Sequence, residues 1–200
     1  IDSDRKFKRL KKLDDLIVYS YRVAGCVGLM MCELLDIRNS NDKYFAIDLG
    51  IAMQITNICR DVFEDLNMER IYLPEEIISD VNIKTEDEKN KLFNKITNLI
   101  EISERYYNSA LHGIKKIPIG SRFSILVSLR LYQAIGRKIV KNRKNYFIKK
   151  IHTTKFEKLI ILLRCLVEFG VSHIFNKKKQ MHNQELHMAL RDLPFTHGKV

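Results

Sequence analysis

The sequence predicts an all-α protein, and three observations support this fold class. Proline and glycine are scarce, at 3 and 8 of 200 residues, which is too few for the frequent turns of an all-β domain. The long stretches between them are rich in Leu, Ile, Lys and Glu, a composition typical of helices. No segment alternates apolar and polar residues long enough to indicate a sheet. We expect one helical domain in residues 1–175, followed by a basic, loosely ordered tail in 176–200.

The first two predicted helices span about 13–35 and 43–65, and a polar connection rich in Asn and Asp separates them. The first contains three small residues, Ala24, Gly25 and Gly28. Glycine inside a helix is less favourable than alanine by about 1 kcal/mol, so their clustering needs a structural reason. We expect close approach of another helix or of a bulky ligand at this place.

Three further helices are predicted at about 87–116, 121–145 and 154–175. The first of these follows Thr85, with Glu88 three residues later, which is a typical N-terminal capping pattern. Pro118 and Gly120 break the chain before the next one. The apolar run 159–175 contains Arg164 and Glu168 and is too short to span a bilayer, so we expect a buried or half-buried helix there.

Composition excludes several classes of protein. A chain with 46% hydrophobic and 30% charged residues is not intrinsically disordered. Its four cysteines form no CxxC pair and have no histidine at zinc-finger spacing, so a reducing cytoplasm is the simplest location. We also recognise no signal peptide at the start. The net charge of +11 lies entirely in residues 137–200, because the preceding residues carry equal numbers of each sign.

The most informative segment runs from Gln54 to Asp65. Within it Asn57, Asp61 and Asp65 are spaced four residues apart, so on a helix they stack on one face at intervals of about 6 Å. Gln54 shares that face. Two carboxylates and an amide oxygen in a row suit Mg²⁺, which prefers oxygen ligands, retained water and substrate phosphate oxygens. Mn²⁺ is an alternative. Arg60 lies beside the row and could bind a diphosphate oxygen.

A solvated helix face is the alternative interpretation of this spacing, and two observations argue against it. The preceding stretch 46–58 is largely apolar, so the acidic row emerges from a buried helix. Neither aspartate has Lys or Arg four residues later. Like charges at this spacing cost about 0.2–0.5 kcal/mol unless a cation lies between them. Arg70 and Tyr72 follow in a loop that could close over the row.

Three blocks carry a resemblance to a known family. They are Tyr19-x-Tyr-x-Val-Ala-Gly-x-Val-Gly28, Leu49-Gly-x-Ala-x-Gln-x-Thr-Asn-x-x-Arg-Asp-Val-x-Glu-Asp65 and Arg70-Ile-Tyr-Leu-Pro74. In this order and spacing they resemble the squalene/phytoene synthase family. A weaker block, Leu131-Tyr-x-x-Ile-Gly136, resembles the bacterial phytoene synthases in particular. The resemblance covers most of the chain up to about residue 163.

The resemblance implies an all-α, isoprenoid synthase-type helical bundle that condenses two prenyl diphosphates head to head. Ionisation of one substrate gives an allylic cation, which the double bond of the second attacks to form a cyclopropylcarbinyl diphosphate. A second ionisation and rearrangement gives the linear product. With two geranylgeranyl diphosphates the product is phytoene, for carotenoid biosynthesis, and no NADPH is needed. Mg²⁺ ions held by two aspartate-rich motifs bind the diphosphates.

Residue roles follow from the same resemblance. Asn57, Asp61 and Asp65 match the second metal motif, with Gln54 beside it. Arg60 and Arg70 match diphosphate contacts, and Tyr72 lies near them. The residues that match the lining of the prenyl channel and cavity are Tyr19, Val23, Gly25, Val27 and Tyr132. The physics agrees, because small side chains leave room for a lipid chain and tyrosine faces shield a carbocation.

One departure concerns the first aspartate-rich motif. The family carries it upstream of the Tyr19 block, and this sequence has no second DxxxD pair. Because the chain also starts with Ile1, we expect an N-terminally truncated sequence that represents the C-terminal, larger part of the domain. We expect these 200 residues to be inactive alone.

Several alternatives remain open at this stage. A squalene or dehydrosqualene synthase would use farnesyl diphosphate, and cavity depth, which sequence does not give, decides between the two. Some relatives look non-catalytic and act in complex assembly. For the basic C-terminal third we favour peripheral contact with an anionic membrane over nucleic acid, for which no motif is present. That contact would place a cytoplasmic protein on the inner membrane face. None of the six histidines is assigned a role.

Overall fold

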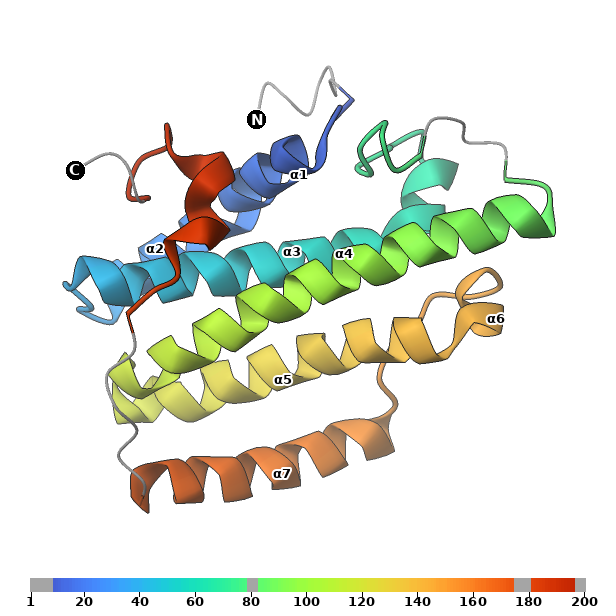
Figure 1. The fold of residues 1–200 in the computed structure, drawn as a ribbon. Coiled ribbons are helices and arrows are strands. Elements are labelled where there is room, and N and C mark those ends of the chain that lie inside the picture. Colours follow the sequence, from blue (N-terminus) through green and yellow to red (C-terminus); the bar gives the residue numbers. More distant parts are fainter. Residues whose placement is uncertain (1–8, 79–82, 175–180, 197–200) are drawn as a thin grey trace.

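The computed structural model describes residues 9–78, 83–174 and 181–196, and every regular element within them is helical (Figure 1). The all-α fold class is therefore confirmed. The elements are α1 (Leu13–Ser20), the π-helical segment η2 (Tyr21–Gly25), α2 (Cys26–Leu34), α3 (Ser40–Asn67), α4 (Glu86–Gly113), η3 (Ile114–Lys116), α5 (Ile119–Lys141), α6 (Arg143–Tyr146), α7 (Lys155–Ile174) and η4 (Gln184–Leu190).

The antiparallel pair α3 and α4 forms the centre of the bundle (Figure 1). The rod made by α1, η2 and α2 packs on one side of α3, whereas α5 packs below α3 and α4 and carries α7 on its far side. A stripe of buried apolar residues follows one side of α3 at helical spacing: Ile47, Ile51, Ile55, Ile58 and Val62. This periodicity explains why the segment is helical and which side faces the core.

The five predicted helices are all present, and their ends have local causes. The Thr85 hydroxyl accepts from the Glu88 backbone N–H at 3.2 Å, and the Glu88 carboxylate accepts from the Thr85 N–H at 2.8 Å. This reciprocal pair is the capping box that the sequence predicts. The predicted helix over 121–145 is in fact α5 followed by the short α6, because the chain leaves the helical conformation at Asn142.

The small residues of the first helical rod permit backbone-to-backbone contact. A Cβ atom built on Gly28 would lie 2.3 Å from the Ala46 carbonyl oxygen on α3. The reciprocal contact is made by Gly50 on α3, where a Cβ would lie 2.3 Å from the Ala24 carbonyl oxygen. Close approach of a second helix therefore explains the cluster. By length and composition alone the run Leu13–Leu34 could cross a membrane, but Leu16 and Tyr21 pack into the core.

Two expectations about the C-terminal third are wrong. The helix over 154–175 was expected to be buried or half-buried, yet α7 exposes most of its apolar side chains, including Leu163 and Val167, and of its cysteine and leucines only Cys165 is buried. It contacts the rest of the bundle mainly through α5.

The tail was expected to be loosely ordered. Residues 181–196 instead pack against α1, α3 and α4, with Leu186, His187 and Leu190 buried. The rest of the tail lies outside the described residues. The physical reason is its apolar side chains, of which Leu186 and Leu190 are buried, whereas the lysines that make the tail basic precede this segment at 177–179.

Candidate functional site

The predicted acidic row lies on the second half of α3. Asp61 is held by two cations. The Arg60 guanidinium donates to it through Nε at 2.8 Å and Nη2 at 2.6 Å, and Lys150 Nζ lies 3.0 Å from its Oδ1. Burial alone would raise the pKa of the Asp61 carboxyl, but the hydrogen bonds from Arg60 and Lys150 outweigh it, so its pKa lies below the ordinary value. Asp61 is therefore ionised at neutral pH.

Asp65, one turn further along, behaves in the opposite way. Partial burial and the negative charge of Asp61 raise its pKa above the ordinary value. The positive charge of Arg70 compensates in part. Two neighbouring carboxylates whose pKa values move apart are typical of a functional site rather than of a solvated helix face. The arrangement suits a site where a cation binds between them.

Asn57 supplies the most direct sign of a missing ligand. Its side-chain oxygen Oδ1 is buried and has no hydrogen-bond partner among the described residues. A buried polar atom without a partner costs about 1–3 kcal/mol, so such an atom needs an explanation. Together with the carboxylates of Asp61 and Asp65 it completes an all-oxygen donor set. This chemistry fits a hard divalent cation such as Mg²⁺, and Mn²⁺ accepts similar ligands.

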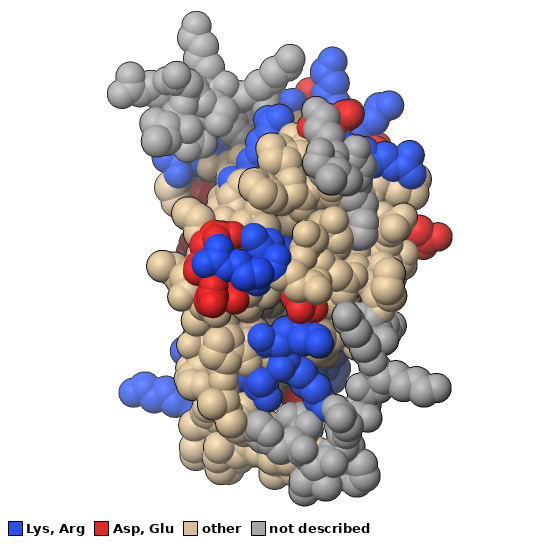
Figure 2. Space-filling model, turned by 90° about the vertical axis from the view of Figure 1, so that its left-hand side faces the viewer, with Lys and Arg blue, Asp and Glu red and all other residues tan. Residues whose placement is uncertain are grey.

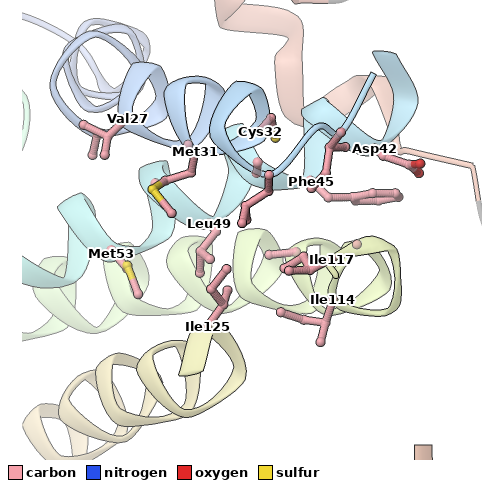
Figure 3. Close-up of a pocket in the computed structure, with 18 of the residues that line it drawn as sticks. Val27, Met31, Cys32, Asp42, Phe45, Leu49, Met53, Ile114, Ile117 and Ile125 are labelled. Carbon is pink, nitrogen blue, oxygen red and sulfur yellow. The ribbon is translucent and has the colours of Figure 1, made fainter. Parts of the chain in front are cut away.

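A mainly apolar pocket of about 310 Å³ begins beside this row. Figure 3 shows side chains of α2, α3 and α5 converging on it, with Met31, Leu49, Met53 and Ile125 facing one another. The lining also includes Gln54, Asn57 and Tyr132, so the polar end of the pocket meets the start of the acidic row. An apolar cavity with a few polar groups at one end is the usual form of a site for an amphipathic ligand.

The structure distributes the remaining predicted channel residues between the pocket and other places. Val27 lines the pocket. Gly25 does not, because it packs against the Tyr21 ring and Ile47 instead. Val23 is 44% exposed and is also outside the pocket lining. Tyr19 stacks on Tyr72, with ring centroids 5.5 Å apart and planes inclined by 29°.

The loop residues reach the acidic row from the other side. Asp65, Arg70 and Tyr72 line one small crevice beside α3. The Arg70 backbone N–H donates to the Asp65 carbonyl at 2.8 Å, which fixes the turn that follows α3. The structure therefore brings the loop block and the helical block together, and the stack of Tyr19 on Tyr72 connects both to the first helical rod.

Lys150 is a site residue that the sequence did not single out. It bridges Asp61 and Glu64, with its Nζ 3.0 Å from the first carboxylate and 2.6 Å from the second. It belongs to a run of basic residues after α6, more than eighty residues from α3 in the chain. Only the tertiary fold shows which lysine of this run reaches the acidic row.

Some basic residues of the C-terminal third form ion pairs within the fold. Acidic partners are contributed by α3, α4 and α7, in pairs such as Arg137 with Glu104 and Lys138 with Glu157. At one end of the bundle, Lys43 and Arg38 share Glu33. On the face drawn in Figure 2, charged atoms of both signs lie side by side. Arg137, Arg143 and Lys150 pair with acidic residues of the preceding part of the chain, and these pairs offset a small part of the charge asymmetry.

Comparison with known proteins agrees with this geometry. Residues 2–157 match the family model described as squalene/phytoene synthase. The chain is 35% identical over 161 residues to a 15-cis-phytoene synthase of Paracoccus sp., covering 80% of this chain and 53% of that protein. It is 37% identical over 176 residues to a phytoene synthase of Rhodobacter capsulatus, covering 85% and 52%.

The fold agrees as well. A crystal structure of a dehydrosqualene synthase in complex with ligand superposes with a TM-score of 0.68 at 30% identity, covering 84% of this chain and 61% of that one. The chain spans about half the length of the curated relatives it matches. On the family match and the shared fold, this chain belongs to the squalene/phytoene synthase family.

Proposed function

We propose that the protein is a phytoene synthase-like prenyltransferase that condenses two geranylgeranyl diphosphates head to head through a cyclopropylcarbinyl diphosphate. The observation that carries the proposal is the position of the acidic row at the polar end of an apolar pocket, with the buried Asn57 oxygen unpartnered between them. A diphosphate on a long hydrocarbon chain has the matching distribution of charge and apolar surface. Its product would enter carotenoid biosynthesis.

Asn57, Asp61 and Asp65 are the residues that would hold Mg²⁺. When bound, the ion would neutralise diphosphate charge and so favour departure of the leaving group. The Arg60 guanidinium donates two hydrogen bonds to Asp61, and its remaining N–H groups can bind a diphosphate oxygen. Lys150 forms an ion pair with the same carboxylate and would add a second positive charge where the leaving group develops negative charge.

The apolar pocket and the aromatic side chains would protect the reactive carbocation. The pocket lining of Met, Leu and Ile side chains excludes water from the hydrocarbon chain. Tyr132 lines the pocket and presents a polarisable ring to a positive charge. The stacked Tyr19 and Tyr72 lie on the loop side, together with Arg70, where they would cover the diphosphate. Gln54 would orient the substrate at the polar end.

Chain length distinguishes this proposal from its nearest alternative. Similarity to relatives named phytoene synthase supports a C20 substrate for this protein, whereas similarity to the dehydrosqualene synthase structure supports a C15 substrate. We choose C20 because the chain is more similar to the named phytoene synthases. A C20 condensation also proceeds without NADPH.

The test is turnover by the longest protein that the reading frame encodes, with Mg²⁺ and labelled C15 and C20 diphosphates in competition. We expect a C40 hydrocarbon without added NADPH. Exclusive formation of a C30 product would instead establish the farnesyl-using alternative. Asp61→Asn should abolish product, and Glu101→Gln, an exposed carboxylate on α4, should not. Unchanged activity of the Asp61 variant would contradict the proposed site and favour a non-catalytic role.

We place the enzyme in the cytoplasm, in peripheral contact with the inner membrane face through its C-terminal third. The support is α7, which exposes Phe156, Leu159 and Leu163 next to the exposed Lys155 and Lys158. An amphipathic basic surface of this kind attracts anionic lipid. Co-sedimentation with liposomes should increase with the anionic lipid fraction, and indifference to that fraction would contradict this placement.

A further inference from the structure

A second cluster of ligand-type side chains lies away from the proposed active site. Asp48 on α3 and two histidines of the C-terminal segment, His182 and His187, meet in the interior with no exposed side-chain surface. The two histidines lie beyond residue 157, where the match to the family model ends. The cluster therefore joins the family domain to a segment outside that match.

The three side chains point their donor atoms at one another. His182 Nε2 lies 2.7 Å from one carboxylate oxygen of Asp48, and His187 Nε2 lies 3.0 Å from the other. The two imidazole centroids are 4.4 Å apart. One donor atom from each residue can be chosen so that all three lie within 4.8 Å of one another. In a tetrahedral zinc site with bonds of 2.0–2.1 Å, donor atoms are about 3.3 Å apart, so small side-chain shifts suffice.

The surroundings of Asp48 support a cation at this place. Its carboxylate is fully buried, and no Lys or Arg in the described part of the chain pairs with it. A buried carboxylate is unfavourable unless hydrogen bonds and positive charge compensate it, and a cation held by the carboxylate and the two imidazoles would supply that charge. The Ser109 hydroxyl donates to Asp48 Oδ2 at 2.5 Å and so fixes the orientation of the carboxylate. Such outer hydrogen bonds to a ligating carboxylate are typical of metal sites.

The cluster is independent of the acidic row. Nine residues separate Asp48 from Asn57, which places them about 13 Å apart along α3 and on opposite faces of the helix. The donor sets also differ, because the acidic row offers only oxygen atoms, whereas the cluster offers two imidazole nitrogens. Nitrogen donors favour Zn²⁺ and related transition metals over Mg²⁺.

We propose that Asp48, His182 and His187 form a buried Zn²⁺ site that fastens the C-terminal segment to α3. Water or the second carboxylate oxygen completes the coordination. Single hydrogen bonds also connect the C-terminal segment to the bundle. The Tyr106 hydroxyl donates to the Leu186 carbonyl at 2.7 Å, and the Asn41 side-chain oxygen accepts from the His182 backbone N–H at 3.1 Å. A metal with one ligand on α3 and two on the segment would hold it more strongly than such bonds do.

The test uses the 200-residue chain after treatment with a chelator. We expect one equivalent of Zn²⁺ to bind and to raise the melting temperature by about 5–10 °C at a free concentration about 100 times the Kd. Co²⁺ in place of Zn²⁺ should give the visible d–d bands of a four-coordinate site without a thiolate charge-transfer band. This readout separates the cluster from the four free cysteines and needs no activity and no variant.

Variants locate the site. His187→Gln should lose the tight equivalent and the Zn²⁺-induced shift, whereas His152→Gln, which changes an exposed histidine, should keep both. Asp61→Asn should also keep both, since it changes only the acidic row. Absence of tight Zn²⁺ binding to the chelator-treated wild-type chain would overturn the proposal and leave the cluster as a hydrogen-bonded one. Binding that survives in His187→Gln, or a thiolate band with Co²⁺, would overturn it as well.

Discussion

Replacing Gly50 by alanine tests the close packing of α3 against the first helical rod. The added Cβ would lie 2.3 Å from the Ala24 carbonyl oxygen and 2.7 Å from the Gly25 backbone nitrogen. An ordinary carbon–oxygen contact is about 3.3 Å or longer, so the two backbones must separate by about 1 Å. Both obstructing groups are main-chain atoms of a helical segment, and no side-chain rotation can relieve the contact.

The expected energy follows from two opposing effects. Alanine improves helix propensity by about 1 kcal/mol, whereas overpacking of this kind costs about 3 kcal/mol when backbone must move. We therefore expect Gly50→Ala to lower the free energy of unfolding by about 2 kcal/mol and the melting temperature by about 4–8 °C. Thermal and urea unfolding followed by circular dichroism measure both quantities.

Gly170 provides the matched control. It lies inside α7 and is exposed, and a Cβ added to it would meet no other atom within 4 Å. Gly170→Ala should gain only the helix propensity, raising stability by about 0.5–1 kcal/mol. The two substitutions are chemically identical and should have opposite signs. If Gly50→Ala stabilises the chain as much as Gly170→Ala, the argument from backbone contact is refuted.

Three further substitutions test the site and its supports. The pKa of Asp65 is raised, so the stability that its protonated form contributes is lost as pH rises. At pH 7 without Mg²⁺, Asp65→Asn should therefore raise the melting temperature, and a lower melting temperature would contradict this. The same variant should weaken Mg²⁺-dependent pyrophosphate binding at least about 100-fold. Thr154→Ala removes the cap of α7 and should cost about 1 kcal/mol in urea unfolding. The pKa of its partner Glu157 is lowered to about 2, mainly by Lys138, so the stability this carboxylate adds should disappear as pH falls from about 4.5 toward that value; a pH-independent stability would contradict this. Tyr146→Phe removes a buried hydroxyl that donates to a backbone carbonyl of α3 at 2.7 Å. It should lower the free energy of unfolding by about 1 kcal/mol, and an unchanged value would contradict this hydrogen bond.

Local signals predicted most of the helical architecture. The Thr85 capping pattern marked the start of α4, and the largely apolar stretch 46–58 marked α3 as a buried helix. The four-residue spacing of Asn57, Asp61 and Asp65 also placed these side chains correctly on one helix. These features depend on residues close together in the chain, where propensity and periodicity are informative.

Long-range contacts decide the features that the sequence did not predict. Lys150 reaches Asp61 only because α5 and α6 return the chain to α3. His182 and His187 were assigned no role, since their partner Asp48 lies more than 130 residues earlier. Gly25 was expected in the channel, but it packs against the Tyr21 ring and Ile47 of α3. No spacing rule within a single segment reveals such pairings.

The central claim is that the acidic row and the adjoining pocket bind a prenyl diphosphate through Mg²⁺. Calorimetric titration with an unreactive C20 prenyl thiodiphosphate tests it most directly, with and without Mg²⁺. We predict binding that requires Mg²⁺, disappears in Asp61→Asn, persists in Glu101→Gln, and weakens when pyrophosphate replaces the prenyl compound. Equal affinity without Mg²⁺, or in the Asp61 variant, would contradict the account.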